Sequence, residues 1–225
     1  MFQISDGWKS IYPQAHVGVL VMRGVINPPH HAELERQKAA LEEQIRVRFA
    51  GQERLEIAEH PVLMAYEAYY KRFKKTYHVQ LQLESILLKG KSIPGVAALV
   101  EAMFMAEMDD LLLTAGHDLD TLRFPATLNV ATGNEKYTTM RGIEQTLKAG
   151  DMFIADGDGI ISSIIYGPDK HTQIKPQTRN VIFTVYAPEG IGPTLVEAHL
   201  RKIEQNVLTI APRAQTELLG VFGAN

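Results

Sequence analysis

Apolar and polar positions follow a helical spacing over much of the chain before residue 112. Apolar residues recur every three to four positions over 31–49, 53–73 and 79–88, and again over 194–208 near the end, which predicts four helices. Pro61 interrupts the second of these, so we expect a bend or break there. Residues 96–112 are apolar on nearly every side, which predicts a central buried helix.

A different pattern dominates after Arg123. Alternating β-branched and aromatic residues predict strands at 126–132, 152–155, 160–166 and 180–186, in addition to an early strand at 15–26. Alternating aspartates and glycines at residues 156–159, between two predicted strands, predict a hairpin turn. A calcium loop is disfavoured, because two aspartates in so short a segment lack the further ligands that it needs. The polar residues 116–118 predict a turn after the central helix. Helices mostly precede strands, so the expected class is α+β, with helices packed on a mixed or antiparallel sheet.

Composition narrows the functional classes. The absence of cysteine excludes disulfides, thiolate zinc sites and cysteine nucleophiles. A net charge of -3 provides no global footprint for nucleic acid, so any RNA contact must come from a local patch. The first residues lack the pattern of a signal peptide, and the longest apolar run, 93–108, is too short to span a bilayer. We therefore expect a soluble, cytoplasmic protein without membrane contact.

The familiar signatures of hydrolases, kinases, dehydrogenases and zinc proteases are absent from the sequence. We accordingly expect neither a cofactor nor a metal. Any chemistry then depends on single polar residues, each of which has a functional and a structural interpretation.

Two such residues lie in the central helix and just after it. His117 can orient water or a hydroxyl, because a neutral imidazole both donates and accepts; alternatively it is a turn residue bonded to local carbonyls. Glu101, on the apolar helix, can bind an amine or a ribose hydroxyl. Alternatively it is a glutamate in the first turns, favoured by the helix dipole and reaching solvent.

The polar segment 167–172 between two predicted strands can cap a pocket, with Ser163 on the strand before it. The alternative is a solvated connection in which threonines, including Thr172 and Thr184, simply favour strands.

A basic run rich in aromatic residues covers 66–78. Its cations can bind phosphates, and Tyr70 or Tyr77 can stack on bases. Alternatively, the run is a helix with buried rings and solvated lysines. The candidate RNA-binding residues are Lys71, Arg72, Lys74 and Lys75.

Short motifs occur in a characteristic order from about Tyr69 to Val207. They are Leu81–Leu88, Gly90–Val96, Leu99–Glu101, Gly116–Asp120, Leu128–Ala131, Gly133–Glu135, Gly150–Asp151, Asp156, Tyr166–Gly167, Thr172 and Thr178–Phe183. In this order they resemble the B3/B4-type tRNA-binding and editing domain of the bacterial phenylalanyl-tRNA synthetase beta subunit, and especially its free-standing relatives. The resemblance implies a variable N-terminal segment, residues 1–65, packed on a B3/B4-like domain, residues 66–225.

The resemblance further implies a ligand cleft between the central helix and the sheet. The implied activity is hydrolysis of the ester that joins a wrong amino acid to tRNA, so the implied partner is tRNA or aminoacyl-tRNA. Water and ester are positioned by backbone groups and polar side chains, without a covalent nucleophile. The resulting candidates are His117, Glu101 and Thr172 for catalysis, and Phe104, Asp118, Ser163, Gly167 and Thr184 for substrate binding.

The sequence departs from the family at two positions of the central helix. Glu101 and Phe104 occupy the places where relatives carry an aspartate and an asparagine. If Phe104 closes the cleft, a non-catalytic RNA- or small-ligand-binding module is favoured instead. A third alternative is binding or hydrolysis of a free amino-acid derivative, tested by whether the cations of 71–75 face the cleft mouth. Thr184 lies near the position of the glutamate that reads a tyrosine hydroxyl in the synthetase, which disfavours tyrosine as substrate.

Overall fold

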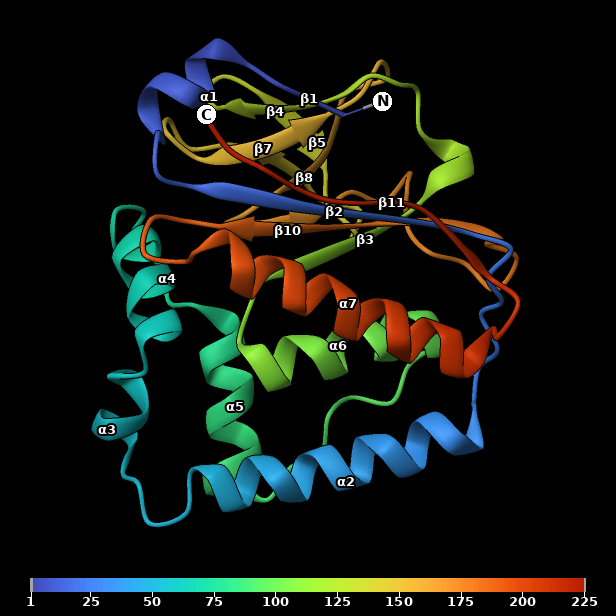
Figure 1. Cartoon of the computed structure of the whole chain (residues 1–225). Helices are drawn as coiled ribbons and strands as arrows, with labels where there is room; N and C mark the ends of the chain where they lie inside the picture. Colours follow the sequence, from blue (N-terminus) through green and yellow to red (C-terminus); the bar gives the residue numbers. More distant parts are fainter. Residues whose placement is uncertain (1, 225) are drawn as a thin grey trace.

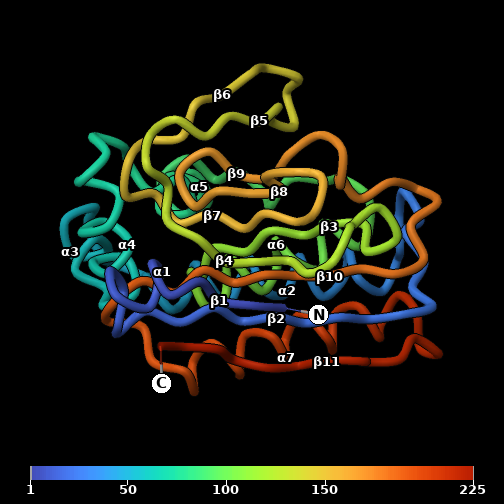
Figure 2. The backbone as a smooth tube through the Cα atoms, turned by 90° about the horizontal axis from the view of Figure 1, so that it is seen from above, coloured from blue at the N-terminus to red at the C-terminus, as the bar shows by residue number. Residues whose placement is uncertain are grey.

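Two β-sheets lie above a layer of helices in the computed structural model, which describes residues 2–224 (Figure 1). The outer sheet has the order β1-β4-β7-β8-β9 and contains β1 (Phe2–Ile4), β4 (Ala126–Val130), β7 (Met152–Ala155), β8 (Ile160–Ser163) and β9 (Gly167–Pro168). The middle sheet has the order β11-β2-β10-β3 and contains β2 (His16–Arg23), β3 (Thr114–Asp118), β10 (Asn180–Ala187) and β11 (Gln215–Phe222). A separate hairpin, which projects at one side in Figure 2, contains β5 (Lys136–Thr138) and β6 (Glu144–Thr146).

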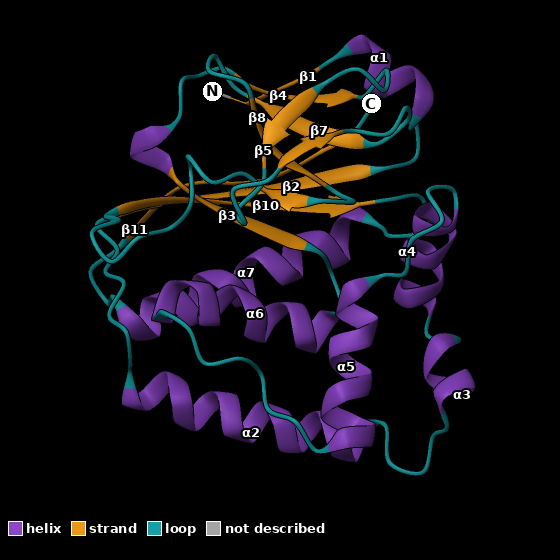
Figure 3. Cartoon of the chain, turned by 180° about the vertical axis from the view of Figure 1, so that it is seen from behind, coloured by secondary structure: helices purple, strands orange, loops and turns teal. Residues whose placement is uncertain are grey.

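The outer sheet is mixed, because β1 pairs with β4 in parallel while β4, β7, β8 and β9 pair antiparallel. The middle sheet is antiparallel. Figure 3 shows α6 and α7 directly beneath the middle sheet and α2 farther from it. The helices are α1 (Asp6–Ile11), α2 (Ala32–Arg48), α3 (Arg54–Ala58), α4 (Pro61–Lys71), α5 (His78–Lys89), α6 (Ala98–Asp110), the short 3-10 helix η1 (Leu119–Thr121) and α7 (Pro193–Ile210). The predicted α+β class, with helices on a mixed or antiparallel sheet, is confirmed.

Local sequence explains the two helices that support the middle sheet. α7 begins with Pro193 directly after Gly192, a position where proline's missing N–H costs nothing. The predicted apolar face of α7 is buried at Val196, Leu200, Ile203 and Val207. α6 is buried on nearly all sides and ends where Leu111 adopts the left-handed conformation, with a φ of 62°. The central buried helix is therefore present, two residues shorter at each end than predicted.

The prediction of a turn at residues 116–118 is wrong. These residues belong to β3, in which His117 pairs with Ile182 of β10, and every position is buried. Gly116 lies in close packing rather than in a turn, because a Cβ there would lie 2.9 Å from Ile174 Cδ1 and 3.1 Å from Phe183 Cδ1. Polarity suggested a turn, but pairing with a distant strand and burial favour extended backbone.

The predicted helix at 53–73 is two helices, α3 and α4, separated at Glu59 and His60, and Pro61 is the first residue of α4. The expected break is therefore confirmed. The segment 1–65 supplies β2, which lies between β10 and β11, and α2, which packs against α6. The boundary at residue 65 stays a prediction. Within residues 2–224, no helix has both the length and the apolar character that a membrane span requires.

Candidate functional site

A cavity of about 470 Å³, called the cleft below, lies between helices α5 and α6 on one side and strands β3, β8 and β9 on the other. Its size is typical of sites for small ligands, and its lining is mainly apolar with a few polar groups. Apolar lining residues include Val96, Val100, Met103, Phe104, Leu113 and Ile174, and polar ones include Gln82, Glu107, Thr114, Ser163, Gln173 and Tyr186.

Phe104 forms part of the cleft wall and leaves the cavity open. The side chain is only partly buried, on the α6 face that also presents Val100 and Met103. Closure of the cleft by Phe104, the condition that favoured a non-catalytic module, is therefore not met.

Glu107 is the most unusual group in the cleft, and its role was not predicted from the sequence. Only 2% of the residue is exposed, and its Oε1 accepts the Thr114 amide N–H at 2.9 Å. Burial raises the pKa of the Glu107 carboxyl to about 8, against a smaller lowering by that hydrogen bond. The available signal was a carboxylate three residues after Phe104, on the same stripe of the helix.

Buried tyrosines support the junction between α6 and β3. The Tyr66 hydroxyl accepts the Leu113 amide at 2.9 Å and donates to the Tyr186 carbonyl. The Tyr77 hydroxyl donates to the Leu111 carbonyl at 2.9 Å, and its ring stacks on that of Tyr66 with centroids 4.1 Å apart. These bonds hold the backbone on which Glu107 and Thr114 meet.

The functional alternative for residues 66–78, in which Tyr70 or Tyr77 stacks on nucleic-acid bases, is wrong. Both rings are buried in the core, at 2% and 0% exposure, and the Tyr70 hydroxyl donates to the Ile164 carbonyl at 2.7 Å. Burying these large rings stabilises the core and leaves them unavailable to a ligand. The alternative of a helix with buried rings therefore holds for these two tyrosines.

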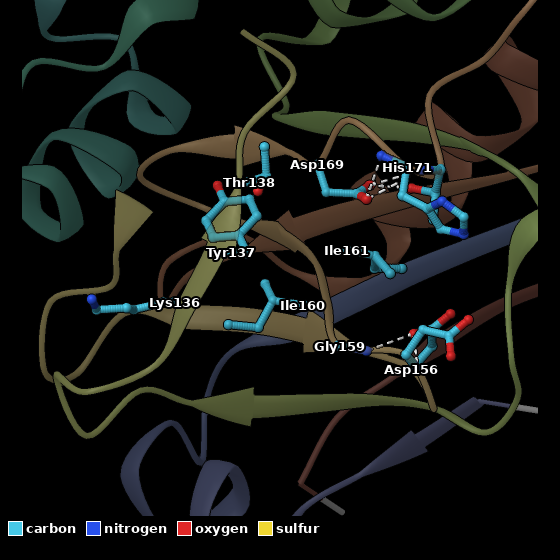
Figure 4. A pocket seen from close by; sticks show the side chains of 11 residues that line it. Lys136, Tyr137, Thr138, Asp156, Gly159, Ile160, Ile161, Asp169 and His171 are labelled. Carbon is cyan, nitrogen blue, oxygen red and sulfur yellow. Dashed lines mark hydrogen bonds between the residues drawn. The ribbon is translucent and has the colours of Figure 1, made fainter. Parts of the chain in front are cut away.

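A second cavity, of about 480 Å³, lies over strand β8 and the segment that follows β9. Figure 4 shows Asp169 and His171 on one side of it and Asp156 beside Gly159 on another. Thr172 also lines this cavity, and its hydroxyl donates to the Asp169 carboxylate.

His117 is linked to the Asp169 carboxylate through the Thr172 hydroxyl. The distance from His117 Nδ1 to Thr172 Oγ1 is 2.7 Å. Because the threonine hydroxyl hydrogen goes to Asp169, the imidazole must donate from Nδ1, which leaves the lone pair on Nε2. Burial lowers the pKa of His117 to about 4, so the ring is neutral, and its Nε2 is buried without a hydrogen-bond partner among residues 2–224.

The structure separates the predicted catalytic and substrate-binding residues into two groups. Phe104, Ser163 and Gly167 line the cleft. His117 and Thr172 do not, although their chain neighbours Gly116 and Gln173 do. The bond between His117 and Thr172 therefore holds one cleft wall to β3 from behind.

Of the remaining three candidates, two are engaged by other parts of the fold, and one has no hydrogen-bond partner for its side chain in the described part of the chain. Glu101 is buried, pairs with Lys38 Nζ at 3.0 Å and accepts the Val96 amide at 2.8 Å, so the alternative in which it reaches solvent is wrong. Asp118 accepts the Thr178 hydroxyl at 2.7 Å and caps η1. Thr184 is fully buried, and its hydroxyl has no partner among residues 2–224.

None of the four candidate RNA-binding cations lines the cleft. Lys71 pairs with Glu67 at 2.9 Å, and the Arg72 guanidinium lies 5.3 to 5.6 Å from three aromatic ring centroids. Lys74 is exposed, and the Lys75 ammonium lies 5.7 Å from the centroid of another aromatic ring.

Comparison with known proteins identifies the family. A family model described as the B3/4 domain matches residues 64–207, more than half of the chain. The phenylalanine–tRNA ligase beta subunit of Fusobacterium nucleatum is 35% identical over 79 residues, which cover 34% of this chain and 10% of that relative. The chain therefore spans about a tenth of the length of that relative.

A solved N-terminal fragment of the phenylalanyl-tRNA synthetase beta subunit from Pyrococcus horikoshii superposes with a TM-score of 0.52 over 96% of this chain and 50% of the fragment. At 13% identity this similarity shows the fold alone. Together with the match over residues 64–207, it confirms the resemblance inferred from the order of motifs: the chain belongs to the B3/4 domain family.

Proposed function

We propose that the cleft binds the aminoacyl part of a misacylated tRNA and hydrolyses its ester with a positioned water. The observation that supports this is the open, mainly apolar cavity of about 470 Å³ beside α6, at the place where the family resemblance implies a ligand cleft. An apolar amino-acid side chain fits such a lining, and the few polar groups can orient the ester.

The polar groups of the cleft suit positioning better than covalent catalysis. Ser163 Oγ accepts the Tyr166 amide at 3.0 Å, and no histidine within residues 2–224 is hydrogen-bonded to it. The acidic neighbour of Ser163 is Asp151, a buried carboxyl that already accepts the Tyr69 hydroxyl at 2.9 Å, so among the described residues Ser163 lacks the histidine base that activates a serine nucleophile. In this proposal His117 and Thr172 are positioning residues, since they hold the wall that contains Gln173 and do not face the substrate.

A specific observation favours a second candidate, hydrolysis of a free amino-acid derivative without tRNA. The cations of residues 71–75 do not line the cleft, so the electrostatic contact expected of a bound tRNA is not found at that place. The same cavity then serves a smaller ester.

The test is deacylation of a panel of mischarged tRNAs and of the corresponding amino-acid methyl esters. Val100→Trp fills the cleft from its wall, and Val47→Trp makes the same change at an exposed position of α2. We expect the wild type and Val47→Trp to cleave at least one ester, and Val100→Trp to lose that activity while keeping its circular dichroism spectrum.

His117→Ala is expected to lower the same activity by loosening the wall. Cleavage of methyl esters alone, without tRNA affinity in a gel shift at low salt, selects the second candidate. If the wild type cleaves no ester above background, both candidates fail.

A further inference from the structure

The Glu107 carboxyl has one oxygen in use and one without a protein donor. Oε1 accepts the Thr114 amide, whereas no hydrogen-bond donor to Oε2 is present within residues 2–224. The residue lines the cleft and is otherwise enclosed by apolar surface. Oε2 is accessible from the cleft rather than enclosed in the core, so a ligand in the cleft can supply the hydrogen bond that the protein does not.

The groups that face Glu107 from neighbouring elements do not supply a cation. Tyr66 and Tyr70 come from α4, Tyr77 precedes α5, and Tyr186 comes from β10; burial raises the pKa of each of these hydroxyls, so all are neutral. His78 lies at the exposed rim of the cleft.

Two further groups lie behind Glu107. The Thr114 hydroxyl is bonded to His199 Nε2 at 2.8 Å, and burial lowers the pKa of that histidine. The lysine nearest to this histidine, Lys202, is engaged by Asp109 at 2.6 Å and by Asp110 at 2.5 Å. No positive charge within residues 2–224 is therefore directed at the Glu107 carboxyl.

We propose that Glu107 anchors the ammonium group of a ligand whose apolar body fills the remainder of the cleft. The proposed ligand class is a primary amine with an apolar side chain, of which an amino-acid ester is one member. This inference rests on the cleft being the ligand site proposed above, and it names the group by which the ligand is held. An ammonium supplies both the missing donor and the missing charge.

The proposal predicts a defined exchange of protons. Because the pKa of free Glu107 is about 8, the carboxyl is mostly protonated at pH 7. An amine ligand arrives mostly charged at that pH, so forming the pair releases about one proton. Affinity therefore rises about tenfold per pH unit between pH 6 and 7, since binding and proton release are linked.

The experiment uses amides, which the proposed hydrolysis of esters does not consume. Calorimetric titration of the full chain compares L-phenylalaninamide with 3-phenylpropanamide, and L-leucinamide with 4-methylpentanamide; each pair differs only by the amino group. Titrations at pH 6 and 7, in two buffers of different ionisation enthalpy, measure the protons released. The variants are Glu107→Gln and, as a control, Glu59→Gln at an exposed position.

We expect at least one amine to bind at least tenfold more tightly than its deaminated partner, with release of about one proton. Glu107→Gln should lose both the preference and the proton release, while Glu59→Gln keeps both. Equal affinity within each pair, binding without proton release, or no binding of any amine at millimolar concentration overturns the inference. Amine binding without ester cleavage refutes the proposed function alone, and ester cleavage that is indifferent to the amino group refutes this inference alone.

Discussion

Replacing Glu107 by glutamine should stabilise the protein, and by more as the pH rises. Glutamine keeps the volume and an oxygen that can accept the Thr114 amide, but it carries no ionisable proton. Any gain in unfolding free energy that depends on pH is then due to ionisation of the carboxyl itself. The substitution therefore separates the electrostatic effect of burial from packing.

The size of the effect follows from the pKa. Burial raises the pKa of Glu107 from an ordinary 4.5 to about 8, so between these values the folded chain retains a proton that the unfolded chain releases. The contribution of Glu107 to wild-type stability must then fall as pH rises through this window, by about 1.4 kcal/mol per unit and about 5 kcal/mol in all. The variant lacks this loss, so its advantage should grow at the same rate from about pH 5 to 8.

Urea unfolding followed by circular dichroism at pH 5, 6, 7 and 8 measures this advantage. Wild type and Glu107→Gln are compared with Glu59→Gln, an exposed carboxyl whose loss should shift the curve by the same small amount at every pH. Taking the difference between variant and wild type cancels the titration of all other groups. A difference in unfolding free energy that stays constant from pH 5 to 8 would refute the burial argument.

Three further substitutions test the packing around the cleft and beneath the middle sheet by the same unfolding assay. Tyr66→Phe removes a hydroxyl that bonds two buried backbone groups, so we expect a loss of about 1–3 kcal/mol. Gly18→Ala places a Cβ 2.7 Å from Val196 Cγ1, which should shift α7 and cost about 1–3 kcal/mol. The unfolding free energy of the wild type minus that of His117→Ala should rise from pH 4 to 6.5, because the ring bonded to Thr172 stays neutral in the fold and takes a proton on unfolding.

Control substitutions of similar size at unpacked or exposed positions separate these effects from a general loss of stability. Gly7→Ala, in helix α1 with no neighbouring atom closer than 4.0 Å, should be neutral or stabilising. Met64→Leu is an exposed substitution on the same helix as Tyr66 and should change the stability little. Wild-type levels of stability in Tyr66→Phe or Gly18→Ala would contradict the packing described above.

Local signals were sufficient for the longer helices and insufficient for the short helix α1 and for β3. α7 was predicted because its apolar spacing and the Gly192-Pro193 start lie within the segment itself. The extended conformation of residues 116–118 depends on pairing with β10, more than sixty residues later. The local sequence contains only the polar residues His117 and Asp118 after a glycine, and these indicated a turn. Strand β11 was missed for the same reason, since its pairing with β2 spans almost the whole chain.

The candidate site shows the same limit. The resemblance placed Phe104, Ser163 and Gly167 at the cleft, where the structure has them. His117 and Thr172 were both candidates, but their bond joins residues 55 positions apart and turns them into a support behind the wall. Glu107 was not a candidate because a helix that is apolar on nearly every side has no polar face, so its periodicity does not indicate which side meets the cavity.

The two assays proposed for Glu107 must move in opposite directions if the carboxyl serves a ligand. A neutral side chain of similar volume is expected to stabilise the fold, since replacing buried charge by uncharged groups is often favourable. The same change removes the partner of an ammonium and should weaken amine binding. A purely structural glutamate predicts unchanged ligand affinity in Glu107→Gln whatever happens to stability, because the Thr114 contact, which glutamine can keep, would then be its only role. A gain in stability with a loss of affinity is the pattern of a functional group held at a cost to the fold.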